Sequence, residues 1–358
     1  MRAMIVKEFR ELRRDRRTMG MLVGLPLLLL IVFGFAANFT VSELRVGVFG
    51  PQAAGVEQAI ESNPEASDVL HVATVDPAGT DATARDYLRD AKADLVFVAD
   101  SPRPMVYIDG SDLFAAQSAK VAVARMGDRI QSQVLFNPYL KTSWVMVPAI
   151  IGLILTFIGT IITSIGLVKE RESGTLEQLA VMPFSPAAVI LGKIIPYFLL
   201  AALDMIVVTL LGMWIFGVPF NGNVAIFALG AAIFLFAVLG LGVFISTVSK
   251  TTGQAIQGAL MVLLPQILLS GMIFPLASMA AGVRWIGYIL PLTYFTKISQ
   301  GVMLRAADWS TMWIPLVVLT VMAVLIFGAA VIRLTRTIAP ARPHTSAVPT
   351  APAAVAEP

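Results

Sequence analysis

The chain has 358 residues, of which 57% are hydrophobic and only 14% are charged, and its mean hydropathy is +0.80. This composition excludes a soluble globular protein and predicts an α-helical polytopic membrane protein. Cysteine is absent, which excludes thiol catalysis, zinc–thiolate sites and disulfides. The formal net charge of +3 says little, because the position of each charge relative to the membrane matters more than the sum.

The N-terminal part of the chain combines a basic segment with an apolar one. Residues 1–17 contain seven Lys or Arg side chains, and Ile5, Phe9 and Leu12 recur at helical spacing, so we expect a cytoplasmic basic amphipathic helix. Residues 18–42 are uncharged over 25 positions, long enough to cross a bilayer and too long for the core of a signal peptide. A nucleic-acid-binding patch is the alternative for the basic segment. The apolar run that follows at once favours an uncleaved transmembrane helix 1 that begins inside the cell.

Residues 43–141 are more polar and alternate short apolar runs with helical patterns. The expected strands are Leu44–Phe49, Val69–Val75, Asp94–Val98 and Met105–Ile108, and the expected helices are Gly55–Ser62, Asp81–Ala93 and Asp112–Phe136. Together they predict an inserted extracytoplasmic α/β domain of about 100 residues, large enough for its own core. Its basic residues do not oppose an external position, because long translocated domains largely escape the positive-inside rule.

Residues 142–338 are predicted to contain transmembrane helices 2–6. Runs with little or no charge place these helices at 142–168, about 194–216, 224–247, 254–274 and 309–332. The irregular sequence over 275–292 predicts a re-entrant outer segment. Six spans with both termini cytoplasmic agree with the enrichment of Lys and Arg in the short inner segments. Residues 339–358, rich in Pro, Ala and Thr, are predicted to form a disordered cytoplasmic tail.

Two features inside the predicted spans are unusual. Gly152, Gly159 and Gly166 recur every seven residues and therefore share one face of helix 2, which favours close helix packing over a substrate groove. Asp204 is the one acid in the middle of a span, where a charge costs about 3 kcal/mol or more. It either serves substrate or proton passage or is the hydrogen-bonding partner of a buried polar side chain such as Gln266.

The connection between the second and third spans carries a dense cluster of charge. Five charged side chains fall within residues 169–177. Thr175 and Gln178 fit a capping box, and Gly174 lets the chain turn just before it. These signals predict a short helix at the membrane surface within residues 169–193, and an ordinary solvated loop helix is the alternative reading.

Two stretches resemble the ABC-2 type transporter permeases, of the multidrug-efflux-like kind with a large extracytoplasmic domain between the first two spans. The first is ERE-x-GT-x-EQL at residues 170–179, followed by Pro183 and Pro186. The second stretch contains QAxQ at 254–257, LP at 264–265, LLSG at 268–271, FP at 274–275 and PLTYF at 291–295. It departs from the family at residues 280–282, where Ala-Ala-Gly stands in place of a more usual Met-Pro.

The resemblance implies a function for the whole chain. It implies the permease subunit of an ABC exporter that moves a hydrophobic or amphipathic substrate (a drug, lipid-like molecule or peptide) outward across the bacterial inner membrane. No G-x-x-x-x-G-K-[ST] stretch occurs, so ATP and Mg are expected on a separate ATPase subunit, present in two copies, and this chain is not itself an enzyme. A second permease chain, identical or paralogous, membrane lipid and an external periplasmic partner are the other expected contacts. No nucleic acid, metal, cofactor or catalytic residue is expected.

The resemblance also implies site residues. The expected ATPase-coupling residues are Glu170, Arg171, Glu172, Gly174, Thr175, Leu176, Glu177, Gln178 and Leu179. The expected substrate path is formed by Asp204, Gln254, Gln257 and Gln266. Export of a polysaccharide or another glycan is an alternative within the family, and a membrane receptor or scaffold that binds a ligand through its external domain is the alternative from another class.

Overall fold

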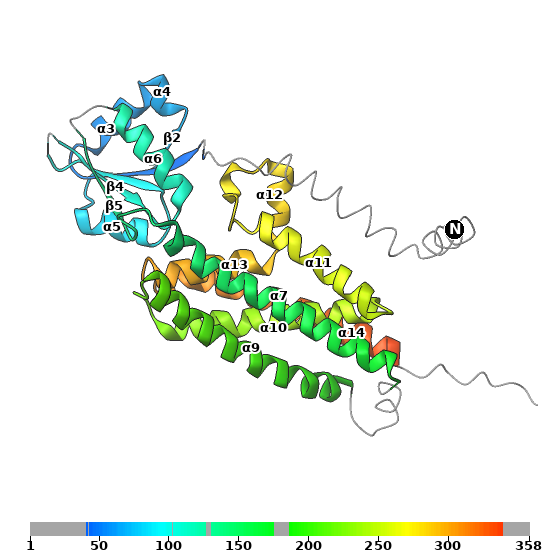
Figure 1. The fold of residues 1–358 in the computed structure, drawn as a ribbon. Coiled ribbons are helices and arrows are strands. Elements are labelled where there is room, and N and C mark those ends of the chain that lie inside the picture. The colour runs from blue at the N-terminus through cyan, green and yellow to red at the C-terminus, as the bar shows by residue number, and fades with distance from the viewer. Residues whose placement is uncertain (1–40, 42, 102, 127–129, 175–185, 339–358) are drawn as a thin grey trace, which may run out of the picture.

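The protein is described from a computed structural model, in which residue 41 and residues 43–101, 103–126, 130–174 and 186–338 are defined (Figure 1). An α/β domain sits at one end of a bundle of long helices. We call the opposite end of the bundle its distal end. The predicted N-terminal helix, transmembrane helix 1 apart from residue 41, and the C-terminal tail lie outside the described residues.

The α/β domain is built on a five-stranded sheet of order β2-β1-β3-β4-β5. Strand β1 pairs in parallel with β2 and β3, β3 pairs antiparallel with β4, and β4 pairs in parallel with β5. The strands are β1 (Leu44–Phe49), β2 (Leu70–Asp76), β3 (Leu95–Val98), β4 (Met105–Asp109) and β5 (Gln131–Leu135). The four strands predicted from the sequence are therefore confirmed, each within one or two residues of its expected bounds.

Helices cover both faces of this sheet. They are α3 (Ala53–Glu61), α4 (Pro64–Ser67), α5 (Asp81–Arg89) and α6 (Leu113–Arg125). Alternate residues of β3 point to opposite faces: Phe97 packs in the core beneath α3 and α6, whereas Val96 packs with Leu88 of α5. A sheet buried on both faces explains why β1 and β3 read as nearly continuous apolar runs.

The predicted helix at 112–136 is wrong in its second half. Helix α6 ends at Arg125, and β5 occupies 131–135 as an edge strand whose residues pair with β4 from Met105–Gln131 to Asp109–Leu135. The sequence QSQVL is partly exposed and shows little hydrophobic alternation. Pairing with β4 satisfies the backbone N–H and C=O groups on one side of β5. No local pattern in the sequence predicts this pairing.

Five helices of the described residues are long and apolar enough to cross a membrane. They are α7 (Thr142–Glu172), α9 (Pro186–Phe216), α10 (Val224–Val248), α11 (Thr252–Leu269) and α14 (Trp309–Ile338). Three short pieces lie between α11 and α14, namely η1 (Leu276–Ser278), α12 (Ala281–Tyr288) and α13 (Pro291–Met303). Helix α13 is largely buried, with Phe295 stacked on Phe234 of α10.

The glycine stripe of α7 packs against three different helices. A Cβ atom at Gly152 would lie 2.5 Å from Cδ1 of Phe295 in α13, and one at Gly159 would lie 2.8 Å from Cγ1 of Val238 in α10. Gly166 faces the hydroxyl of Tyr197 in α9. These approaches confirm the prediction that the stripe serves close helix packing.

Two element boundaries differ from those expected. Helix α11 stops at Leu269 rather than near residue 274, because Gly271 takes a φ of +86° and Pro275 follows. Residues 186–193, expected within the coupling segment, already belong to α9, which begins at Pro186. Proline is favoured in the first helical turn, where its missing N–H needs no partner.

Candidate functional site at the distal end of the bundle

The charged motif of the sequence lies where α7 ends. The last turn of this helix is closed by Ser173, whose N–H donates to the carbonyl of Lys169, and by Gly174, whose N–H donates to the carbonyl of Arg171. Gly174 has a φ of +74°, a left-handed conformation that glycine adopts without steric cost. The chain therefore turns at Gly174 as the sequence predicts.

Arg171 reaches from α7 to the end of α10. Its Nη1 donates to the carbonyl oxygen of Ser246 at 3.0 Å and to that of Ser249 at 2.9 Å. These carbonyls belong to the last turn and the C-cap of α10, where no further turn of helix supplies N–H donors. The guanidinium thus caps α10 from a neighbouring helix.

Glu172 reaches to the start of α11. Its Oε1 accepts from the N–H of Thr252 at 3.0 Å, and its Oε2 accepts from the Thr252 hydroxyl at 2.9 Å. Thr252 is the first residue of α11, and its N–H has no partner within the helix. The carboxylate therefore satisfies the N-terminus of α11.

The two adjacent charges match the two helix ends that they touch. The C-terminus of a helix carries partial negative charge and its N-terminus partial positive charge. The cation of Arg171 lies at the C-terminus of α10, and the anion of Glu172 lies at the N-terminus of α11. Together they bind the α10–α11 turn, residues 249–251, to the end of α7.

The other expected coupling residues are only partly described. Glu170 is half-buried, and its carbonyl accepts from the hydroxyl of Ser173 at 3.1 Å. The remaining five, Thr175, Leu176, Glu177, Gln178 and Leu179, lie outside the described residues. The structure thus brings together Arg171 and Glu172 and joins them to a turn distant in the chain.

The expected substrate-path residues do not form one cluster of hydrogen bonds. Gln254 acts in a helix cap: its N–H donates to Thr251 Oγ1 at 3.3 Å, and its Oε1 accepts from the N–H of Lys250 at 3.0 Å. Gln266, fully buried, accepts instead from the N–H of Leu292 at the start of α13, at 3.3 Å. It is therefore not recorded as a partner of Asp204.

Three of these polar side chains carry buried atoms that lack a partner within the described part of the chain. They are Oδ2 of Asp204 in α9, and Oε1 of Gln257 and Nε2 of Gln266 in α11. Such atoms are costly in a membrane-spanning bundle, because neither lipid nor water satisfies them. Gln266 is held within the bundle through its oxygen, whereas Asp204 and Gln257 remain candidates for contact with a ligand or a second chain.

The comparison with known proteins covers most of the chain. Residues 16–332 match the sequence profile of the family described as ABC-2 family transporter protein. The chain belongs to the ABC-2 transporter family. This assignment confirms the resemblance drawn from the motifs at 170–179 and 254–295.

Relatives of this ABC-2 chain include three proteins of Escherichia coli K12. It is 33% identical over 341 residues to the probable multidrug ABC transporter permease YbhS, covering 85% of this chain and 88% of the relative. It is 28% identical over 351 residues to the probable multidrug ABC transporter permease YbhR, covering 88% and 94%. The inner membrane transport permease YhhJ is 32% identical over 214 residues, covering 58% and 56%.

The sequence places a short inner loop at Lys250 but does not connect this α10–α11 turn with the motif at 170–179. A signal for the start of α11 was present: Thr251 and Gln254 have the spacing of a capping box, the rule that singled out Thr175 and Gln178. Thr251 is indeed the N-cap of α11. What the pattern did not reveal is that Glu172 adds a second cap to the same helix end.

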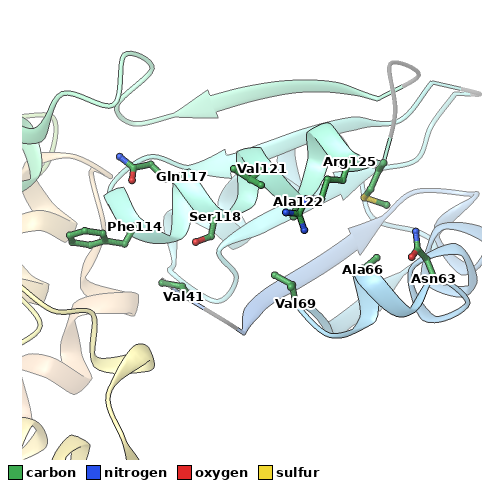
Figure 2. A pocket seen from close by; sticks show the side chains of 11 residues that line it. Val41, Asn63, Ala66, Val69, Phe114, Gln117, Ser118, Val121, Ala122 and Arg125 are labelled. Atoms are coloured by element: carbon green, nitrogen blue, oxygen red, sulfur yellow. The ribbon is translucent and has the colours of Figure 1, made fainter. Parts of the chain in front are cut away.

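The α/β domain of this ABC-2 chain also carries an open groove. It has a volume of about 370 Å³ and runs beside α6 from Phe114 to Arg125, with Val41 and Val69 on the facing wall (Figure 2). Both ends adjoin residues outside the described part of the chain, position 42 and positions 127–129.

Proposed function

We propose that this chain is the transmembrane permease subunit of an ABC exporter, driven by ATP hydrolysis on a separate ATPase subunit. The observation that carries the proposal is the extent of the similarity to YbhS, which spans 85% of this chain and 88% of a protein described as a probable multidrug ABC transporter permease. The shared region is too long to be confined to either the α/β domain or the bundle. A hydrophobic or amphipathic substrate is the class that this relationship favours.

We propose further that the α/β domain lies outside the membrane and the distal end of the bundle inside the cell. Residues 18–42 would then supply a sixth span to the five of the described residues, and both termini would be cytoplasmic. The segment that leaves α7 after Gly174 would face a pair of ATPase subunits at the distal end. A second permease chain would complete the translocation path, as one set of six spans forms half of it.

Co-purification tests the proposed function. The tagged full-length chain is purified from native membranes in mild detergent, and the preparation is assayed for ATP hydrolysis and for its protein components. We expect an ATP-hydrolysing subunit to accompany the chain, and Glu177→Ala, in the proposed docking segment, to weaken that association. Wild-type preparations without any ATPase would overturn the proposal and favour a receptor or scaffold.

The transported class is tested in inside-out vesicles that contain the chain and its ATPase. ATP-dependent accumulation of a lipophilic fluorescent dye, absent with a non-hydrolysable ATP analogue, is the expected result. Accumulation of a lipid-linked oligosaccharide without dye transport would favour the glycan-export alternative instead.

Orientation is tested with single cysteines, which report cleanly because the natural chain has none. Gln58 in α3 and Lys250 in the α10–α11 turn are both exposed. A membrane-impermeant maleimide applied to spheroplasts is expected to label Gln58→Cys at once and Lys250→Cys only after lysis. The reverse pattern would contradict the proposed orientation.

A further inference from the structure

We propose that Arg171 and Glu172 are positioning residues that make the end of α7 and the α10–α11 turn move as one unit. This inference rests on the proposed function. It assigns Glu172 a task different from the expected direct contact with an ATPase, and for Arg171, expected either to dock or to pair locally, it favours a role within the chain. In the structure both are engaged within the chain, and the segment that follows them is left to meet the partner.

The geometry supports a rigid connection. Four hydrogen bonds of 2.9 to 3.0 Å join two consecutive residues of α7 to partners 75 to 80 residues further along the chain. Each involves a charged group, and such bonds are stronger than those between neutral groups. One side chain holds the end of α10 and the other holds the start of α11, so α7 cannot shift lengthwise without moving both helices or breaking these bonds.

The place of Arg171 and Glu172 at the end of α7 explains how these contacts could pass on a movement. Gly174 turns the chain immediately after the Arg171–Glu172 pair, so a push on the segment beyond Gly174 reaches this pair first. Further along α7, Gly159 packs closely against Val238 of α10, so a shift of α7 also presses on α10 there. Helix α11 carries Gln257 and Gln266, two of the polar side chains within the bundle. A displacement at the distal end would therefore be passed to α10 and α11 together. Packed helices switch between discrete arrangements and do not deform gradually, so the two helices would shift as a unit.

The contact itself is tested without any ATPase. Spin labels are placed at Ser173→Cys and Lys250→Cys in the detergent-solubilised full-length chain, and the distance between them is measured by pulsed electron paramagnetic resonance. We expect a narrow distribution that broadens in Arg171→Met combined with Thr252→Val. Lys169→Met, which removes an exposed cation two residues before Arg171 in α7, is the matched control and should leave the distribution narrow. An unchanged distribution in the double variant would overturn the inference.

The transmission role is tested in the reconstituted complex. We expect Arg171→Met and Glu172→Gln to keep the ATPase subunit bound while dye transport per ATP hydrolysed falls about five- to tenfold. Arg171→Lys, which keeps the charge and can still reach one carbonyl, should recover part of the loss.

The outcomes separate this inference from the proposed function. Loss of ATPase co-purification in Glu172→Gln would mean that the carboxylate contacts the partner directly, which overturns the positioning role and leaves the permease function standing. Absence of ATPase from wild type overturns the function and the transmission role together, while the spin-label distances still report whether the contact exists.

Discussion

Nη1 of Arg305 lies 3.7 Å from Oδ2 of Asp109 and so joins the α13–α14 connection to the end of β4. The same atom donates to the hydroxyl of Ser111 at 2.9 Å, and that hydroxyl donates to Oδ1 of Asp109 at 2.6 Å. The two charged side chains are only 12% and 6% exposed. A buried ion pair therefore fastens the α/β domain to the bundle.

Replacing Arg305 with Met should destabilise this junction strongly. The variant leaves the Asp109 carboxylate buried without its cation, a change that costs about 3 to 5 kcal/mol. Thermal unfolding of the full-length protein in detergent should show a clear fall in apparent Tm. Arg103→Met is the control, because Arg103 is exposed and its side chain has no recorded ion pair in the part of the chain described. Equal stability of the two variants would contradict the role of the pair.

A second contact across the same junction should respond to acid. The hydroxyl of Thr311 in α14 donates to Oδ1 of Asp90 at 2.7 Å, and Lys92 bonds Oδ2 at 2.8 Å. Partial burial raises the pKa of Asp90, but the hydrogen bonds from Lys92 and Thr311 lower this pKa by more than burial raises it. The pKa of Asp90 therefore lies below the usual carboxyl value. The native state then holds Asp90 ionised more readily than the unfolded chain does.

The sign of the effect follows from linkage. Stability from a depressed carboxyl pKa is present above the unfolded pKa and is lost as pH falls through the folded one. We expect Asp90→Asn to lack this part of the acid-induced loss when unfolding is followed between neutral and strongly acidic pH. Because Asp90 is only partly buried, the effect should be small, within about 1 kcal/mol. Identical pH profiles for variant and wild type would refute it.

The close packing at the glycine stripe can be tested with Gly152→Ala, and Gly328→Ala serves as its control. Gly152→Ala places a methyl group 2.5 Å from Phe295, and such overpacking costs about 1 to 3 kcal/mol. An added Cβ at Gly328 in α14 meets nothing within 4 Å. Gly328→Ala should therefore be neutral or stabilising by up to about 1 kcal/mol, since alanine favours helix. Thermal unfolding in detergent should place the apparent Tm of Gly152→Ala below that of wild type and the apparent Tm of Gly328→Ala at or above it.

Substitutions at Gln266 and Gln257 should distinguish a side-chain amide that supports the fold from one that contacts a ligand. Gln266→Leu removes the acceptor for the Leu292 N–H at a buried site, which costs about 1 to 3 kcal/mol. Gln257→Leu removes a buried oxygen that has no partner within the described residues, so the stability of this variant should equal or exceed that of wild type. If Gln257 lines the substrate path, dye transport by that variant should fall although its stability does not. Normal transport by Gln257→Leu would remove it from the path.

Asp204→Asn should raise stability. The substitution keeps the shape of the side chain and removes a charge whose Oδ2 is buried without a recorded partner, and a charge at membrane depth costs about 3 kcal/mol. A higher apparent Tm with lost transport would show that the acid is kept for function. A lower apparent Tm would mean instead that a partner outside the described residues depends on the charge.

The amino-acid sequence by itself determined the helical membrane class, the five membrane-length helices within 142–338 and four of the five strands. These features depend on local pattern: a long uncharged run can be satisfied in lipid only as a helix, and β1 and β3 are apolar because both faces of the sheet are covered. The family also followed from local motifs, since ERE-x-GT-x-EQL and PLTYF are each contiguous or nearly so.

Only the tertiary structure decided the features that depend on partners distant in the chain. Strand β5 exists because β4 offers its backbone, although QSQVL has weak strand character of its own. From the sequence, Glu172 was expected to contact an ATPase, and Arg171 either to dock there or to pair locally. In the structure they cap the ends of α11 and α10, 75 to 80 residues away. A helix end exposes unsatisfied N–H or C=O groups whatever its sequence, and which side chain reaches them is settled only when the helices pack.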